Sequence, residues 1–173
     1  MAVNAAGAAA FAWTTGTTSP IRARVQSADG TLEPVQSVWR GDGNVRTWDV
    51  ALDADGGAVF AWAFSRYRPA SSDYIDVAQT RTRAPTGELT PVQTVARADL
   101  IAVVRVAAGA AGNAVFVWSE SPGLAARRRS ADGTLGPVDR LSENGSQAAV
   151  AGNVEGVVAV LGWESPLVGF IGP

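Results

Sequence analysis

The 173-residue sequence contains no cysteine and no histidine. Without these residues the chain cannot form a disulfide framework, a zinc finger, a Cys or His nucleophile, or haem ligation of the usual kind. A Ser-His-Asp triad is also excluded, because its general base is missing. We therefore expect no catalytic residue, no metal site and no cofactor, and we predict that the protein is not an enzyme.

Lysine is absent as well, so arginine supplies all 14 basic side chains, against 16 acidic ones and a net charge of −2. A dedicated nucleic-acid binder normally has a basic footprint, so we expect no nucleic acid as a partner. Arginine in place of lysine, together with abundant alanine, fits a high-GC genome better than a set of arginines chosen to bind carboxylates or phosphates.

Long hydrophobic runs are also missing. No run reaches the roughly 18 to 20 apolar residues of a membrane-spanning helix, so no membrane span is expected. The first 13 residues are partly apolar but lack the positive region of a signal peptide, and they match two internal stretches. We interpret them as folded structure, with no signal peptide in this chain.

The chain contains an internal repeat, which is the strongest signal in the sequence. One motif runs from Asn or Asp through Gly to an apolar stretch that ends in Trp13, Trp62, Trp118 and, with one extra residue, Trp163. A second motif, similar over its whole length, occupies 21–38, 78–95 and 124–141. We interpret residues 1–173 as one domain of four units, approximately 1–49, 50–104, 105–149 and a truncated 150–173.

Each unit is expected to form four short antiparallel strands in a meander. In the third unit these strands are predicted at 106–108, 113–119, 124–130 and 137–141. Asp-Gly and Gly-Gly pairs at the turns indicate hairpins, because such turns need a positive φ. No stretch has the 3.6-residue period of a helix.

The faces of the strands indicate how the sheets pack. Phe116 and Trp118 point to one side of their strand, and Val115 and Val117 point to the other, so both faces are apolar and each sheet should lie between two neighbours. The next strand alternates apolar and polar residues and should lie further out, half exposed. This pattern and the repeat length are typical of β-propeller blades, and a β-solenoid is the alternative.

The expected fold is therefore all-β and propeller-like, with about three and a half blades. Closed propellers typically have four to eight blades, so we expect an incomplete ring. The chain would then be a fragment of a longer protein with further repeats, or it would close by self-association.

The blocks resemble the repeats of large secreted or surface proteins of actinobacteria, with units V-x-V-D-x-x-G-x-A-x-x-x-W and I-x-A-R-x-R-S-A-D-G-T-L-x-P-V-Q-x-L. Here these are Leu52 to Trp62, and Ile21 to Val38 or Leu124 to Leu141. The resemblance implies a propeller-like fold and an extracellular or cell-surface location, and no established activity. The Ser-Ala-Asp-Gly-Thr turns are also similar to the Asp-box turns of sialidase-like propellers, which are structural.

The candidate site is the one irregular segment, an insertion at Ser65–Ile75 in the second unit. Loops of this kind carry function more often than the scaffold beneath them. The candidate ligand-binding residues are Arg66, Tyr67, Arg68, Asp73 and Tyr74. Neutral drift in a surface loop is the alternative explanation.

Three other patterns are better explained by structure. Asp53 and Asp55 could begin a calcium loop, but no further carboxylate follows, so a glycine-supported turn with solvated aspartates is expected. Trp39 and Trp48 should lie between strands, where a tryptophan can stack on a sugar or cap the space between blades. The Arg40-Gly41-Asp42 tripeptide is too short to indicate integrin binding.

Arginines recur in the third strand of each unit, and a sialidase-like enzyme would gather three of them around a substrate carboxylate. Because they repeat with the structural unit, we expect them to cover apolar surface and to pair with acidic residues across strands. These residues are Arg22, Arg24, Arg81, Arg83 and Arg127–Arg129.

The sequence thus favours a non-enzymatic scaffold or binding module of a secreted or surface-displayed bacterial protein, with a carbohydrate or a protein as ligand. The alternative is a fragment of a propeller-type, glycoside-active enzyme. An enzyme should gather several carboxylates asymmetrically around the central channel.

Overall fold

The chain folds into three four-stranded antiparallel sheets, as the expected meander requires. The computed structural model describes residues 1–109, 112–144, 148–152 and 158–162. No α-helix occurs among these residues, and hence no helix that could cross a bilayer. Trp163 and the end of the expected fourth unit lie outside the described residues.

The strands of each sheet follow one another in chain order. The first sheet contains β1 (Ala2–Val3), β2 (Ala9–Trp13), β3 (Ile21–Gln26) and β4 (Gln36–Trp39). The second contains β5 (Asn44–Leu52), β6 (Ala58–Arg68), β7 (Asp73–Arg83) and β8 (Gln93–Ala98). The third contains β9 (Ile101–Ala108), β10 (Ala114–Glu120), β11 (Leu124–Arg129) and β12 (Leu135–Ser142), and a hairpin of β13 (Ala148–Gly152) and β14 (Val158–Gly162) follows.

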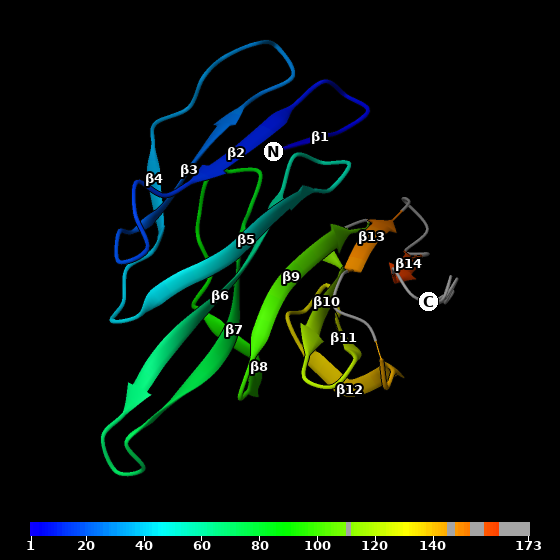
Figure 1. Cartoon of the computed structure of the whole chain (residues 1–173). Helices are drawn as coiled ribbons and strands as arrows, with labels where there is room; N and C mark the ends of the chain where they lie inside the picture. Colours follow the sequence, from blue (N-terminus) through cyan, green and yellow to red (C-terminus); the bar gives the residue numbers. More distant parts are fainter. Residues whose placement is uncertain (110–111, 145–147, 153–157, 163–173) are drawn as a thin grey trace.

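The sheets are stacked face to face like a fan. The first strands β1, β5, β9 and β13 lie next to one another on the inner side of the fan, and β4, β8 and β12 lie on its outer side (Figure 1). Each sheet therefore packs against the next one along the chain.

The turns explain why the meander repeats so regularly. In the turn between the first two strands, the amide of Gly7 donates to the carbonyl of Asn4, and the amide of Gly56 donates to that of Asp53. Gly30, Gly87 and Gly133 close the turn between the third and fourth strands in the same way. All five glycines have φ between 86° and 95°, a conformation that L side chains rarely adopt. The predicted positive-φ hairpins are confirmed.

Two apolar cores hold the three sheets together. Phe60, Trp62 and Phe64 of β6 pack against the first sheet, and Val59 and the small side chains between them pack against the third. Phe116 and Trp118 of β10 lie in the second core, while Val115 and Val117 pack with Ala148 and Val150 of β13. The prediction that the second strand of a unit is buried on both faces is confirmed for β6 and β10.

Candidate functional site

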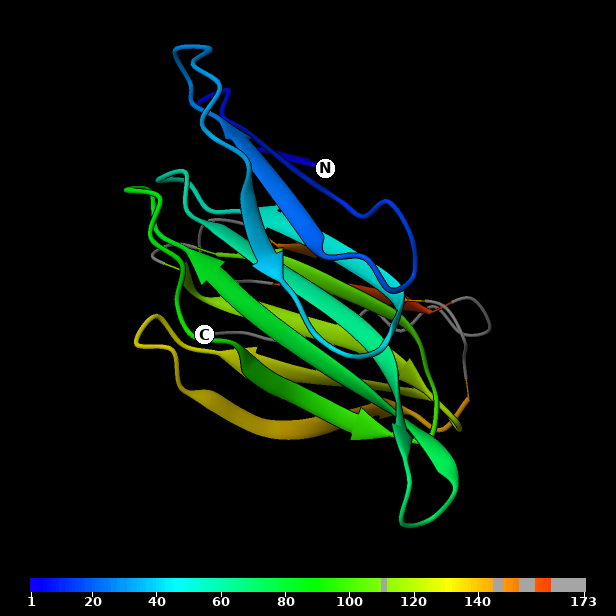
Figure 2. The ribbon, with the colours of Figure 1, turned by 90° about the vertical axis from the view of Figure 1, so that its left-hand side faces the viewer.

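The insertion of the second unit is a regular hairpin rather than an irregular segment. β6 and β7 simply continue beyond the sheet, and residues 69–72 form the turn between them. Figure 2 shows this hairpin reaching past the edge of the neighbouring sheets. The prediction of an irregular loop was wrong, because the two arms pair through their backbones and this pairing leaves no periodic apolar pattern in an exposed ribbon.

The hairpin brings the predicted site residues together in directly opposed pairs. Arg68 lies opposite Asp73, Tyr67 lies opposite Tyr74, and Arg66 lies opposite Ile75. Side chains directly opposite each other in an antiparallel pair are close enough to interact. All five predicted residues therefore lie within one small ribbon.

Arg68 and Asp73 form a two-pronged ion pair near the tip. Arg68 donates from Nε to Oδ1 at 2.9 Å and from Nη2 to Oδ2 at 2.5 Å. The hydroxyl of Ser71 also donates to Oδ1 of Asp73, at 2.6 Å. The bonds from Arg68 and then from Ser71 lower the pKa of Asp73. The tip is therefore held in one shape by charge-assisted hydrogen bonds.

Tyr67 and Tyr74 form an exposed aromatic pair. Their ring centroids are 5.2 Å apart, with an angle of 57° between the ring planes. The two residues are 48% and 57% exposed. Their rings are available to a ligand without any movement of the hairpin.

A hollow of about 580 Å³, lined by both polar and apolar side chains, lies at the foot of the hairpin. Tyr74 lines it, so the hollow and the tyrosine pair form one continuous surface. The other lining residues come from the loop before β3, from β5, from β6 and from β9: Thr17, Asn44, Val45, Arg46, Ser65 and Ala102. We call all seven lining residues, including Tyr74, together with Tyr67 the rim site.

Arg46 is the charged residue of the rim site, and a β-bulge positions it. The register between β5 and β6 shifts between Val45 and Thr47, which is where Arg46 stands. Bulges redirect a side chain out of the regular alternation of a strand. Nε of Arg46 donates to the hydroxyl of Ser65 at 2.5 Å and lies 3.4 Å from Oδ2 of Asp76.

Asp76 anchors this cluster from below. It is 1% exposed, and its carboxylate accepts bonds from the hydroxyl of Ser65 and from the amide of Ile101, the latter at 2.8 Å. A buried carboxylate needs such partners, because an unpaired buried charge costs several kcal/mol. Asp76 therefore fixes Ser65 and Arg46 while the side chain of Arg46, 46% exposed, still reaches solvent.

Arg46 and Asp76 are not among the predicted site residues. Arg46 corresponds to Ala102 in the next unit, so a signal existed: an arginine that breaks the repeat. The structural partners Ser65 and Asp76 are 19 and 30 positions away, and only the folded hairpin brings them to Arg46.

The repeated arginines of the third strands have a structural role, and their partners differ from one arginine to the next. Nε of Arg81 donates to the carbonyl of Thr90 in its own unit at 2.6 Å, and its Nη1 donates to that of Val38 in the preceding sheet at 3.1 Å. Arg127 repeats both contacts, with the carbonyls of Gly136 and Val95. The expected pairing with acidic residues across strands was wrong for these two residues, because backbone carbonyls are their partners.

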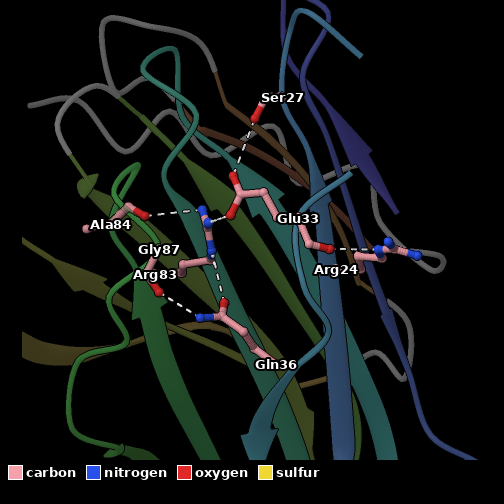
Figure 3. A network of polar contacts seen from close by, with 7 residues as sticks. All are labelled: Arg24, Ser27, Glu33, Gln36, Arg83, Ala84 and Gly87. Carbon is pink, nitrogen blue, oxygen red and sulfur yellow. Dashed lines mark hydrogen bonds and ion pairs between the residues drawn. The ribbon is translucent and has the colours of Figure 1, made fainter. Parts of the chain in front are cut away.

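Arg83 and Arg129 bind the preceding sheet as well. We call the contacts that the two arginines of a third strand make with the fourth strand of the preceding sheet the clasp. Nε of Arg83 donates to Gln36 of the preceding sheet at 3.0 Å, and the amide of Gln36 donates back to the carbonyl of Gly87 at 2.7 Å (Figure 3). Arg83 also forms an ion pair with Glu33. Arg129 and Gln93 repeat the arrangement between the second and third sheets, with Gln93 donating to Gly133.

The candidate calcium loop is a turn, as expected, and Asp55 is exposed, but Asp53 is buried rather than solvated. Asp53 is 6% exposed, and its Oδ1 accepts the amides of Asp55 and Gly57 at 3.0 and 2.7 Å. Burial raises the pKa of Asp53 in spite of these bonds, which act in the opposite direction. Among the described residues, no cluster of three or more potential metal ligands occurs.

The two tryptophans near the first sheet differ. Trp39 ends β4 and is buried, with its ring centroid 5.0 Å from that of Phe64 and 6.4 Å from that of Trp62. Trp48 lies within β5, is 36% exposed and donates to the carbonyl of Ala12 at 3.2 Å. Both stand in strands rather than between them, and Trp39 fills the space between two sheets.

Comparison with protein-family models and with curated proteins found no match for this chain.

Proposed function

We propose that the protein is a non-enzymatic binding module built on β-propeller-type blades, and that the rim site binds its ligand. The observation that carries this proposal is the exposed pair Tyr67 and Tyr74 beside a hollow that Arg46 lines. A carbohydrate is the ligand class that fits best, and a protein segment is the alternative.

The chemistry of the rim site suits a sugar. A sugar ring presents C–H groups that pack on an aromatic face and hydroxyls that need hydrogen-bonding partners. The two tyrosine rings offer the aromatic face, while Arg46, Asn44 and Thr17 offer donors and acceptors. Arginine also binds carboxylates well, so an acidic sugar is the preferred ligand.

The setting that we propose is the surface of a bacterial cell or the extracellular space. The support is the resemblance of the repeated blocks to actinobacterial secreted repeat proteins. A fan of stacked four-stranded sheets, each linked to the next by the clasp, is consistent with blades of an incomplete propeller.

A glycan array with the purified chain tests the proposal. We expect binding to one family of glycans, with acidic ones preferred, and loss of this binding in Tyr67→Ser and Tyr74→Ser. The matched control is Leu32→Ser, which removes another exposed apolar side chain, 50% exposed, from a turn outside the rim site. Both tyrosines are exposed, so their replacement should not affect folding.

Two results would count against the proposal. Binding that Tyr67→Ser and Tyr74→Ser leave unchanged would place the ligand elsewhere. No binding to any glycan on the array, combined with hydrolysis of a sialoside or another glycoside, would favour the alternative that the chain is part of a glycoside-active enzyme.

A further inference from the structure

The first sheet lies at one end of the fan, and no described sheet covers its outer face (Figure 1). Ala10 of β2 belongs to the core against the second sheet, whereas Phe11 and Trp13 of the same strand point the opposite way. Phe60 and Trp62, at the same positions of β6, are 1% and 0% exposed, but Phe11 and Trp13 are only half-buried. The first sheet therefore presents an aromatic pair on a free face.

Arginines stand beside both aromatic residues. On the neighbouring strand β3, Arg24 lies directly opposite Phe11 and Arg22 lies directly opposite Trp13, so all four side chains share one face. Nε of Arg24 donates to the carbonyl of Glu33 at 2.7 Å, which holds the guanidinium in place. Within the described part of the chain, its terminal nitrogens donate no hydrogen bond. Figure 3 shows Arg24 on the side of its sheet away from the clasp.

The positive charge of this face is not balanced on its own strands. Arg22 is exposed, and among the described residues it has no hydrogen-bond or ion-pair partner. Ser37 of β4 lies directly opposite Arg22, and Nε of Arg40, which follows β4, donates to the hydroxyl of Ser37 at 3.0 Å. Strands β1 to β4 contain no aspartate and no glutamate. The face is therefore locally basic in a chain with a net charge of −2.

Two positions distinguish this face from those that receive a neighbouring sheet. Gln79 and Ala125 stand at the place of Arg22 in the second and third units, and neither is charged. A charge at a covered face would need a partner there, because an unpaired buried charge is costly. Gln26 stands where the other two units have a buried clasp arginine. The first sheet has thus lost a clasp residue and gained an exposed charge, which favours an anionic ligand over a further sheet of the same kind.

A polysaccharide that carries carboxylates matches both features of the face. The fork of an arginine binds a carboxylate through two hydrogen bonds, and an aromatic ring packs on the C–H groups of a sugar. A nucleic-acid strand has a charge on every phosphate and needs a wider basic footprint. Asp29 and Asp42, both exposed in the loops before and after β4, limit the basic area here.

We propose that the outer face of the first sheet, formed by Phe11, Trp13, Arg22, Arg24 and Arg40, binds an acidic polysaccharide built from uronic acids. Arg22 and Arg24 bind carboxylates of the polysaccharide, and its sugar rings lie against the two aromatic residues. The two pairs of arginine and aromatic residue are two positions apart on β2, or about 7 Å, so an extended sugar chain reaches both. This site is separate from the rim site and does not depend on it.

Isothermal titration calorimetry with an oligomer of galacturonic acid tests the proposal, in a chain that carries Tyr67→Ser and Tyr74→Ser so that the rim site does not contribute. We expect binding that weakens as the salt concentration rises, and no binding of the uncharged methyl ester of the same oligomer. Arg22→Gln should weaken the binding about tenfold, because it removes a charge-assisted pair. Glutamine stands at the equivalent position in the second unit, so the fold accepts it. Arg97→Gln, which removes an exposed arginine of β8, is the matched control and should have no effect.

Several results overturn the proposal: no binding of the oligomer up to about 1 mM, equal binding of its methyl ester, or binding that Arg22→Gln leaves unchanged. Tighter binding of single-stranded oligothymidine that depends on Arg22 would assign the face to nucleic acid instead. Sedimentation velocity provides a further check, because self-association that Arg22→Gln alters would show that a second copy covers the face. Failure of the rim site would appear on the glycan array with the two tyrosine variants, and it would leave this titration unchanged.

Discussion

At the residue scale, a few polar side chains determine how the apolar sheets fit together. Gln36 and Arg83 are the clearest case, because Arg83 is 1% exposed and its charge is satisfied only by groups on the preceding sheet and on its own turn. The same contact recurs between Gln93 and Arg129, so the clasp is a regular feature of how one unit packs against the next. Catalysis is not needed to explain these arginines.

Replacement of Gln36 tests the clasp. Gln36→Ala removes the acceptor of Arg83 and the donor to Gly87, so we expect a loss of about 2–4 kcal/mol in the free energy of unfolding. Urea unfolding at low protein concentration measures it. Gln26→Ala is the matched control, because Gln26 makes only a weak, exposed bond of 3.3 Å to Gly30, and equal losses in the two variants would contradict the prediction.

Asp53 offers a second test, based on its raised pKa. The first unit has Asn4 at this position, and Oδ1 of Asn4 accepts the amide of Ala8 as Oδ1 of Asp53 accepts that of Gly57. Because burial raises the pKa of Asp53 in the folded state, its favourable contribution is fully present below the ordinary aspartate pKa and is lost as the pH rises through the folded pKa.

We therefore expect Asp53→Asn to gain stability relative to the wild type between about pH 3 and about pH 7. Urea unfolding at the two pH values measures this difference. Asp53→Ala, which removes the acceptor of both amides, should be destabilised at both. A difference between Asp53→Asn and wild type that does not change with pH would show that the charge of Asp53 is not penalised by burial.

At the scale of the element, the β6–β7 hairpin is the feature that distinguishes the second unit. Backbone pairing continues to the pair of Arg68 and Asp73, so the tip is a rigid support for Tyr67 and Tyr74. A rigid aromatic surface loses little conformational entropy when it binds a ligand. The bulge at Arg46 adds a charged group to the same end of the molecule.

The ion pair at the tip should be visible in the titration of Asp73. Arg68 lowers the pKa of Asp73 by hydrogen bonding, so the pair supports the hairpin above the ordinary aspartate pKa, and this support is lost as the pH falls through the lowered value. We expect Arg68→Gln to raise the NMR titration midpoint of the Asp73 carboxyl toward its ordinary value. Arg66→Gln, on the same hairpin, should leave it unchanged, and a similar rise in both variants would exclude a specific pair.

At the scale of the whole molecule, each sheet depends on its neighbours for burial. β6 lies between two apolar cores, and its residues up to Ser65 are all buried, whereas β2 has one covered face. Stability in such stacked repeats is a sum of unit terms and of nearest-neighbour contacts. The middle sheet should therefore be the most stable part.

Hydrogen exchange followed by mass spectrometry tests this gradient. We expect the slowest amide exchange in residues 58–65 of β6 and faster exchange in β2, because opening of β2 disrupts only one interface. Amide exchange that is equally slow in β2 and β6 would contradict the gradient.

The sequence alone was sufficient for the all-β class, the meander and the turns. These depend on local features: the alternation of Phe116, Val117 and Trp118 indicates a strand, and a glycine such as Gly30 or Gly133 defines a turn within a few residues. It also placed the candidate site residues of the insertion, although not their pairing in a regular hairpin.

The tertiary structure decided which side chains work together. Arg83 meets Gln36 at a distance of 47 positions in the chain, and Asp76 meets the amide of Ile101 at 25. Contacts of this kind arise when apolar faces drive the sheets together and the buried polar groups must then find partners across the interface. The strands follow from local periodicity, whereas the clasp and the rim site exist only after the sheets have stacked.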